Sequence, residues 1–107
     1  LLLEHGADVS ATNKETGDSP LHMATIGGHE EVVELLLEHG ADSWPRDNHG
    51  ETPLIYAAVG GFVDVAELLL EHGANASAQN IEGLAPIHFA AMNDRAEFVQ
   101  LLFDNGA

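Results

Sequence analysis

The segment LLLEHGAD spans residues 35–42, and the chain repeats it as LLLEHGAN at residues 68–75. A further copy, LLLEHGAD, opens the chain at residues 1–8, and a diverged copy, LLFDNGA, closes it at residues 101–107. The starting positions differ by 34 (35 minus 1), 33 (68 minus 35) and 33 (101 minus 68) residues. A fixed period of this length predicts a solenoid of stacked supersecondary units in which each unit contacts its neighbours.

The charge balance of the chain is strongly acidic. Its 107 residues include 18 aspartates and glutamates against Lys14, Arg46 and Arg95, which gives a formal net charge of −15. Nucleic acid and anionic membranes bind surfaces rich in lysine and arginine, so we expect neither as a partner. The expected partner is a protein with a basic or a mixed apolar and basic surface.

Cysteine is missing from the composition, which excludes disulfides and thiolate chemistry. The longest nearly apolar run, residues 54–63, is far shorter than the ~20 residues that span a bilayer, and no signal-peptide pattern opens the chain. We therefore expect a soluble intracellular segment, either cytoplasmic or nuclear.

Capping residues and glycines divide the chain into short helices. Ser19 can cap a helix that begins at Pro20, and a glycine ends the helix before each hairpin loop. Ala85 lacks a capping hydroxyl, and Asn93-Asp94 replaces the glycine pair of the other units, so the last unit should be the least stable. The expected helices are Pro20 to about Ile26, Glu30–His39, Pro53 to about Val59, Val63–His72, one that ends near Met92, and Ala96–Asp104.

The combination of these motifs resembles the ankyrin repeat. The residues that carry the resemblance are Thr52-Pro53-Leu54, Ala57-Ala58, Gly61, Leu68-Leu69-Leu70 and Gly73-Ala74, all at the 33-residue period. The resemblance implies an all-α solenoid in which each unit is a hairpin finger followed by two antiparallel helices. It divides the chain into the remnant of a preceding repeat (1–13), two repeats (14–46 and 47–79) and a truncated repeat (80–107).

The stacking of such units depends on small and apolar residues. Val33, Leu36 and Leu37 of one helix need Leu21 and Ala24 of the other, together with the equivalent residues of the next unit. Small side chains allow neighbouring helices to approach within about 8–10 Å; they are Ala24, Ala57, Ala58, Ala90 and Ala91. In the ankyrin family a histidine at the position of His22 and His88 ties the loop to the helix, whereas Ile55 takes that position in the middle unit.

Seven histidines and many carboxylates raise the question of metal binding or catalysis. His5, His39 and His72 occupy equivalent positions in successive units, about 10 Å apart, whereas zinc needs ligands at roughly 2 Å from one ion. Ser19 and His22 recur as a scaffold motif without a third orienting group, so we expect no catalytic residues, no metal and no cofactor. The acidic residues of the second helices are expected to form a solvated face; the columns are Glu31/Asp64/Glu97, Glu34/Glu67 and Glu38/Glu71/Asp104.

Residues that depart from the repeat are the candidates for recognition. Trp44, followed by Pro45 and Arg46, stands where another copy has Ser77-Ala78, and it is either an interface anchor or a cover for the neighbouring finger. Ile26, Val59 and Met92 form a column at the ends of the first helices, on the concave side by resemblance, and they either pack against the fingers or contact a partner. The resemblance adds Asn48, His49, Glu51, Ile81, Glu82 and Leu84 as recognition positions, with Asp18 as a further acidic residue.

We therefore interpret the chain as a module that binds a partner polypeptide through its concave face and fingers. The alternative is a structural spacer, or a segment that docks within a longer ankyrin array. Uncapped ends leave self-association open. An enzymatic activity would require a domain outside these residues.

Overall fold

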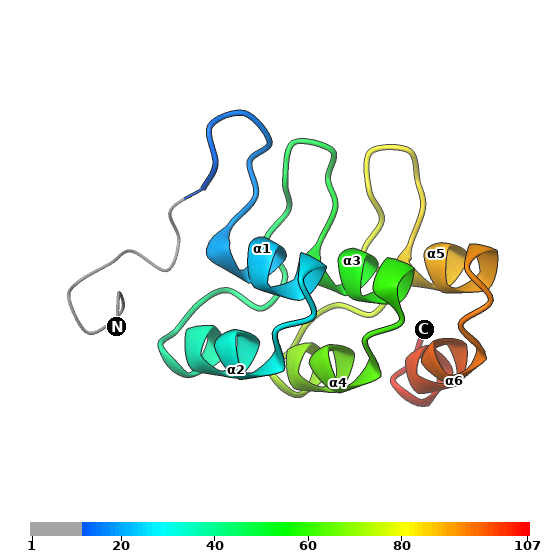
Figure 1. The fold of residues 1–107 in the computed structure, drawn as a ribbon. Coiled ribbons are helices and arrows are strands. Elements are labelled where there is room, and N and C mark those ends of the chain that lie inside the picture. The colour runs from blue at the N-terminus through cyan, green and yellow to red at the C-terminus, as the bar shows by residue number, and fades with distance from the viewer. Residues whose placement is uncertain (1–11) are drawn as a thin grey trace.

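The computed structural model describes residues 12–107 and contains six helices and no β-strand within that range (Figure 1). The helices are α1 (Pro20–Ile26), α2 (Glu30–Glu38), α3 (Pro53–Gly60), α4 (Val63–Glu71), α5 (Pro86–Met92) and α6 (Ala96–Asp104). The predicted helical turn at residues 1–5, and with it His5, lies outside the described residues. The prediction of an all-α solenoid is confirmed.

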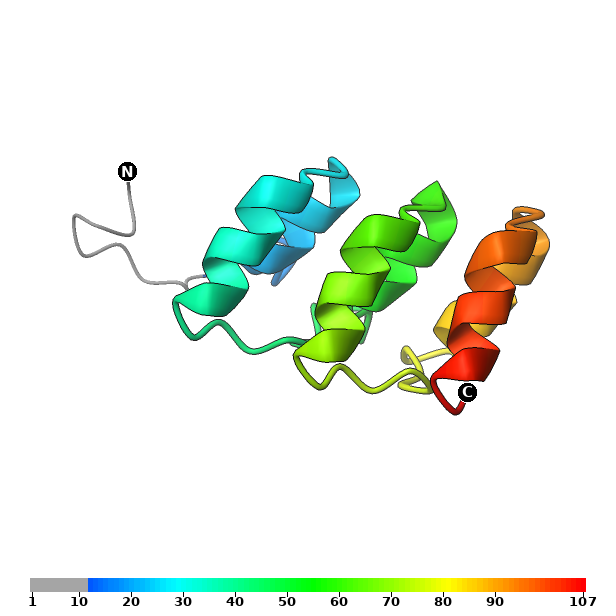
Figure 2. The same ribbon diagram turned by 90° about the horizontal axis from the view of Figure 1, so that it is seen from below.

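The helices form two rows. Helices α1, α3 and α5 lie side by side in one row, and α2, α4 and α6 lie in the other (Figures 1 and 2). Each first helix packs on the second helix of its own unit, and the closely packed pairs between units join neighbours within a row: α1 with α3, α3 with α5, α2 with α4, and α4 with α6. The fold is therefore built from contacts between adjacent units.

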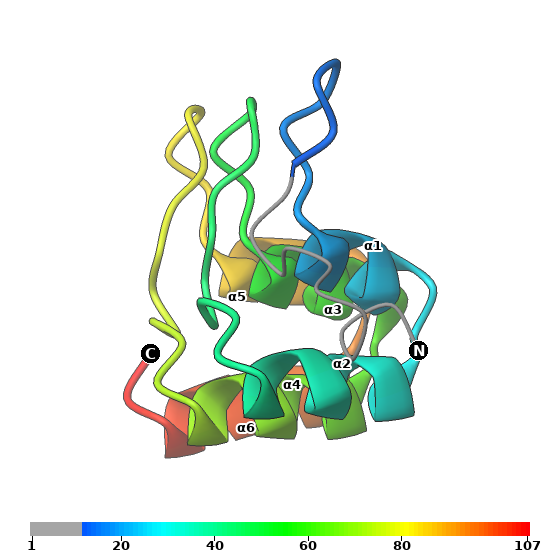
Figure 3. The same cartoon turned by 90° about the vertical axis from the view of Figure 1, so that its left-hand side faces the viewer.

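Three loops project from the first-helix row and are called fingers: residues 13–18, 47–51 and 80–84 (Figure 3). Each finger is closed by a backbone hydrogen bond, from the nitrogen of Asn13, Asp47 or Asn80 to an oxygen four or five residues later. Neighbouring fingers are also joined, because the Asn48 nitrogen donates to the Thr16 oxygen (2.9 Å) and the Ile81 nitrogen to the His49 oxygen (3.0 Å). The fingers thus form one continuous ridge.

Capping sets the starts of the first helices. The Ser19 side chain accepts a hydrogen bond from the His22 nitrogen over 3.2 Å, whereas Ala85 offers no such acceptor. Three boundaries differ from the expectation by one residue: α3 extends to Gly60, whereas α2 and α4 end at Glu38 and Glu71, and the histidines that follow are C-caps. Asp94 adopts a left-handed φ of 56°, as expected for a residue in place of glycine.

The core lies between the two rows. Val33, Leu36 and Leu37 are buried together with Leu21 and Ala24, as predicted. Ala57, Ala58 and Ala90 are also buried, but Ala91 is exposed, so its predicted role in close helix packing is wrong. The reason is its position: Ala58 faces the next unit, whereas no helix of the described chain covers Ala91.

Histidine ties the first unit to the second. The fully buried His22 ring accepts a hydrogen bond at Nδ1 from the Ser19 nitrogen (3.0 Å), and its Nε2 donates to the Glu51 oxygen (2.7 Å). His88 keeps only the local bond from the Ala85 nitrogen (2.9 Å) and is exposed. Ile55, at the same position of the middle unit, is buried and apolar.

Candidate partner-binding surface

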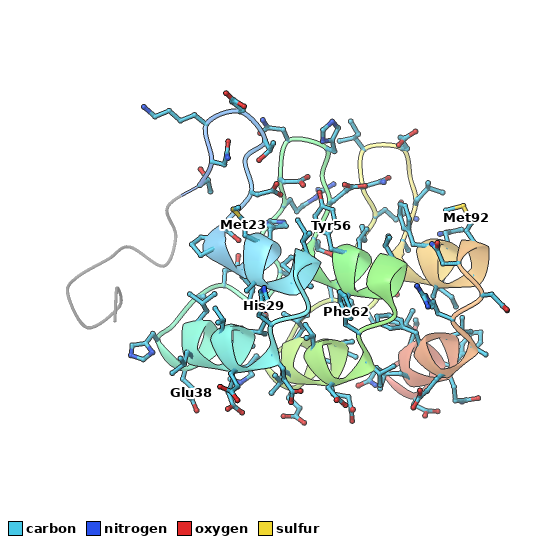
Figure 4. The ribbon with its side chains drawn as sticks, in the orientation of Figure 1. Met23, His29, Glu38, Tyr56, Phe62 and Met92 are labelled. Carbon is cyan, nitrogen blue, oxygen red and sulfur yellow. The ribbon has the colours of Figure 1, made fainter. Side chains whose placement is uncertain are left out.

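The side of the first helices that carries the fingers exposes apolar side chains. Ile26, Val59 and Met92, called the apolar column, are 48%, 41% and 65% exposed. Fractions of this size mean that no finger buries these three side chains. Met23 is 56% exposed, and Figure 4 places it with Tyr56 and Met92 on the finger side of the row, whereas Glu38 points away on the opposite side of the molecule.

Met23 was missed by the sequence analysis, although its position was informative. It stands three residues before Ile26, one helical turn away, and therefore on the same helix face. Its equivalents in the other units are Tyr56 and Phe89, which are both only half-buried. The exposed apolar area thus extends beyond the apolar column along the row of first helices.

The predicted recognition residues of the fingers divide into two groups. His49, Ile81 and Glu82 are exposed, and the Ile81 side chain reaches 68%. The remaining three make contacts within the protein, although Asn48 is exposed as well. The Asn48 side chain donates to the Glu15 oxygen (3.1 Å), the Glu51 carboxylate accepts from Asn80 Nδ2 (3.5 Å), and Leu84 is half-buried.

Trp44 and Arg46 lie apart from the apolar column. They belong to the loop that leads from α2 to the second finger, and Figure 3 shows these loops on the side of the stack opposite to the turns that follow the first helices. Trp44 is 39% exposed and lines a pocket of about 430 Å³ against the loop of residues 75–80. Arg46 Nη2 donates to the Gln79 oxygen (2.8 Å), so this arginine joins the second finger to the loop before the third.

The base of the second finger contains a cluster of polar side chains. The Asp47 carboxylate accepts hydrogen bonds from the Tyr56 hydroxyl (2.6 Å), the Glu51 nitrogen (2.9 Å) and the His49 nitrogen (3.0 Å). Burial alone would raise the pKa of Asp47, but these hydrogen bonds outweigh it and lower the pKa below 3.8. Burial and the bond to Asp47 raise the pKa of Tyr56 well above 10.

Asp18 and His22 complete this cluster from the first unit. Ligand-type atoms of Asp18, His22 and Asp47 all lie within 4.8 Å of one another, a spacing that a metal ion could use. However, both ring nitrogens of His22 are already engaged, Nδ1 by Ser19 and Nε2 by Glu51. A metal at this position would have to break one of those hydrogen bonds. His39 and His72 are not part of the cluster, and the His39 Nδ1 instead donates to the Leu35 oxygen (2.8 Å).

Two further features agree with a structural role. The Ser19 side chain is buried, 2.9 Å from His22 Nδ1, and serves as the helix cap described above. The acidic columns of the second helices are exposed at every position. Three of their residues, Asp64, Glu67 and Glu97, line a pocket of about 490 Å³ together with Glu30 and Phe62.

Among the described residues, no helix is long and apolar enough to cross a membrane.

Comparison with known proteins shows what the chain resembles. The profile of ankyrin repeats (3 copies) matches residues 1–80 and 46–107, which together cover the whole chain. The human 2-5A-dependent ribonuclease is 54% identical over 41 residues, which is 38% of this chain and 6% of that protein. Potassium channel AKT3 of Oryza sativa subsp. japonica is 41% identical over 46 residues, or 43% of this chain and 5% of that protein.

A third relative gives the same result. The human Ankyrin repeat and SOCS box protein 6 is 40% identical over 47 residues, or 44% of this chain and 11% of that protein. The matched segments therefore span a small part of each of these three relatives, which are otherwise different proteins by name. What they share with this chain is the repeat, and the chain belongs to the ankyrin repeat family.

Proposed function

We propose that the chain binds a partner polypeptide through the finger side of its first helices, without catalysis. The observation that carries this proposal is the exposure of the apolar column, at one residue per unit along the whole described stack. A contiguous row of exposed apolar side chains is typical of an interaction site. Ankyrin repeats are in general protein-interaction modules, which supports the same conclusion.

The repeat spacing constrains the partner. Neighbouring first helices pack side by side, and packed helices lie about 8–10 Å apart. An extended segment advances about 3.3 Å per residue, so an apolar side chain at every third residue would match the apolar column. Glu82 and Glu51 lie on the fingers above it and favour a partner that also carries lysine or arginine. We leave Asp18 out of this contact because it faces Asp47.

The test compares two valines of similar exposure. Val59 belongs to the apolar column and is 41% exposed, whereas Val32 lies on α2 and is 46% exposed. A partner captured from a cell extract with the wild-type chain would be purified and its Kd measured with Val59→Lys and Val32→Lys. We expect the first variant to weaken binding at least tenfold and the second to leave it unchanged. Equal effects of the two substitutions would refute the proposed surface.

Trp44 is proposed as a second, separate anchor. Trp44→Ala should weaken partner binding by about 1–2 kcal/mol, as the loss of an interface tryptophan does, with little effect on the free energy of unfolding. The opposite result, a loss of stability with unchanged affinity, would assign Trp44 to covering the loop of residues 75–80. Both quantities are therefore measured on the same variant.

The alternative function, a spacer or docking segment within a longer array, also has an observation in its favour. Leu37 is 5% exposed, but its equivalent in the last unit, Phe103, is 57% exposed. His88 and Ala91 are likewise exposed where His22 and Ala58 are buried. A docking partner of this kind would cover Phe103. Sedimentation of the isolated chain tests self-association: a monomer at every concentration argues against contact between copies through this face.

A further inference from the structure

The junctions between neighbouring fingers use the same two positions but different chemistry. Between the second and third fingers, Asn80 Nδ2 donates a hydrogen bond to the Glu51 carboxylate over 3.5 Å. One period earlier, the residues at these positions are Asp18 and Asp47. The amide donor of the later junction is thus replaced by a second carboxyl group.

The Asp47 carboxylate is held as a hydrogen-bond acceptor. It is 7% exposed, and its two oxygens accept the three hydrogen bonds from Tyr56, Glu51 and His49 described above. All three donors favour the ionised carboxylate. Asp47 is therefore an acceptor, and the group that faces it must supply a donor or repel it.

The carboxyl groups of Asp18 and Asp47 face each other. Its Oδ1 is buried and has no hydrogen-bond partner in the described structure. Two ionised carboxylates with oxygen atoms within 4.8 Å would repel each other, and the burial of Asp18 Oδ1 and of Asp47 weakens the screening by water. The same position in the later junction carries a carboxylate that is satisfied by an amide, which shows the kind of contact the fold requires there.

We propose that Asp18 retains a proton and shares it with Asp47, so that an O–H···O⁻ hydrogen bond joins the first two fingers until rising pH removes it. On ionisation, the O–H bond of Asp18 breaks, the proton passes to water, and the charge of the pair changes from −1 to −2. The junction between the first and second units then loses its hydrogen bond and gains a repulsion. This shared proton belongs to the fold itself and does not depend on the binding of a partner.

The surrounding titratable groups are compatible with this assignment. The groups that face the pair are His22 on α1, Tyr56 on α3, and His49 and Glu51 on the second finger. The hydrogen bonds of His22 require a neutral ring, because its Nδ1 accepts from the Ser19 nitrogen. Burial raises the pKa of Asp18 above 3.8 and the hydrogen bond with Asp47 raises it further, and these effects outweigh the hydrogen bond with Thr16, which acts in the opposite direction.

The sign of the pH dependence follows from this direction. A carboxyl whose pKa is raised by folding stabilises the folded state below its unfolded pKa, and this contribution is lost as the pH rises through the folded pKa. For Asp18 the loss begins near pH 3.8 and is complete above its raised value. Each unit of pKa difference changes the unfolding equilibrium constant about tenfold.

The test uses Asp18→Asn, which keeps a permanent donor at this position. Glu15→Gln is the matched control, since Glu15 lies on the same finger, is exposed, and loses the same charge on substitution. Urea unfolding of the three proteins is measured between pH 4 and 8. We expect the unfolding equilibrium constant of the wild type to rise relative to that of Asp18→Asn over this range, while Glu15→Gln follows the wild type. Parallel curves for the wild type and Asp18→Asn would overturn the shared proton.

A second variant and a direct titration separate this proposal from a metal site. Asp47→Asn copies Asn80, whose Oδ1 accepts the backbone bonds of its own finger from Glu82 and Leu84, and it should lower the pKa of Asp18 relative to the wild type because its amide can donate to the ionised carboxylate. The carboxyl carbon of Asp18, followed by NMR, should titrate at a lower pH in Asp47→Asn than in the wild type, where its midpoint should lie above pH 3.8. A midpoint at or below that value would contradict the proposal. Stabilisation of the wild type, but not of Asp18→Asn, by zinc or calcium would assign the pair to a cation instead.

Discussion

The ring of Phe62 packs against Gly28 of the preceding unit, so closely that a Cβ at residue 28 would lie 3.0 Å from its ring carbons. Gly28 also has a φ of +68°, which side chains rarely adopt. Arg95 stands in the same relation to Gly61, with its Cδ 2.9 Å from the position of a Cβ. In each of the first two units, the glycine after the first helix therefore provides room for a side chain of the next unit.

Gly28→Ala should destabilise the fold by more than backbone strain alone. Gly40 is the matched control, because its φ is +89° and nothing lies within 4 Å of a Cβ placed there. We expect Gly40→Ala to cost about 1–2 kcal/mol from the left-handed backbone, and Gly28→Ala about 1–3 kcal/mol more from overpacking. The free energy of unfolding in urea gives both values, and the excess should disappear when Phe62→Ala is present in both proteins.

Ala85→Ser should stabilise the last unit. The equivalent Ser19 and Thr52 accept a hydrogen bond from the third residue of their helices, and Ala85 has no side chain that can do so. Restoring the cap should contribute about 1 kcal/mol, and the reverse change, Ser19→Ala, should remove at least as much. Urea unfolding measures both variants, and an unchanged midpoint for Ala85→Ser would mean that the His88 bond already satisfies this helix end.

Added salt should raise the melting temperature. The net charge is −15, and exposed pairs such as Glu34 and Glu38 lie one helical turn apart on the same face. Between about 0.01 and 0.15 M salt the Debye length falls from about 30 to about 8 Å, which screens this repulsion. Thermal unfolding monitored by circular dichroism at several sodium chloride concentrations provides the measurement. A flat or falling melting temperature would show that the acidic face does not destabilise the fold.

The helices were predictable from the sequence to within one residue at most ends because their signals are local. A capping residue, a proline at the first helical position and a glycine after the last turn each act within a few residues. The burial of Leu21 or Val33 was predictable for a related reason, since the period shows which residues recur on the packed side. Ala91 is the exception, because no helix of the described chain covers it.

The relations between sites were harder to predict. Trp44 and the apolar column are candidates on the same grounds in the sequence, yet the loop of Trp44 lies on the side of the stack opposite to the turns that follow the first helices, where the apolar column stands. The Asp18–Asp47 contact could not be predicted from the period, because the two residues are 29 positions apart (47 minus 18) whereas the repeat aligns residues 33 positions apart. The same offset of 29 separates His22 from Glu51 and Glu51 from Asn80, which are also in contact.

The order of amide and carboxyl side chains at the finger junctions also bears on how such a chain could be shortened. Removing the 33 residues 47–79 would leave every helix with a neighbour of its own kind and would bring Asn80 opposite Asp18. That pairing is the one already present between Glu51 and Asn80, which holds without a shared proton. The pH dependence of stability that arises from the shared proton thus belongs to a single junction between repeats. Deleting one repeat would remove it while the solenoid fold remains.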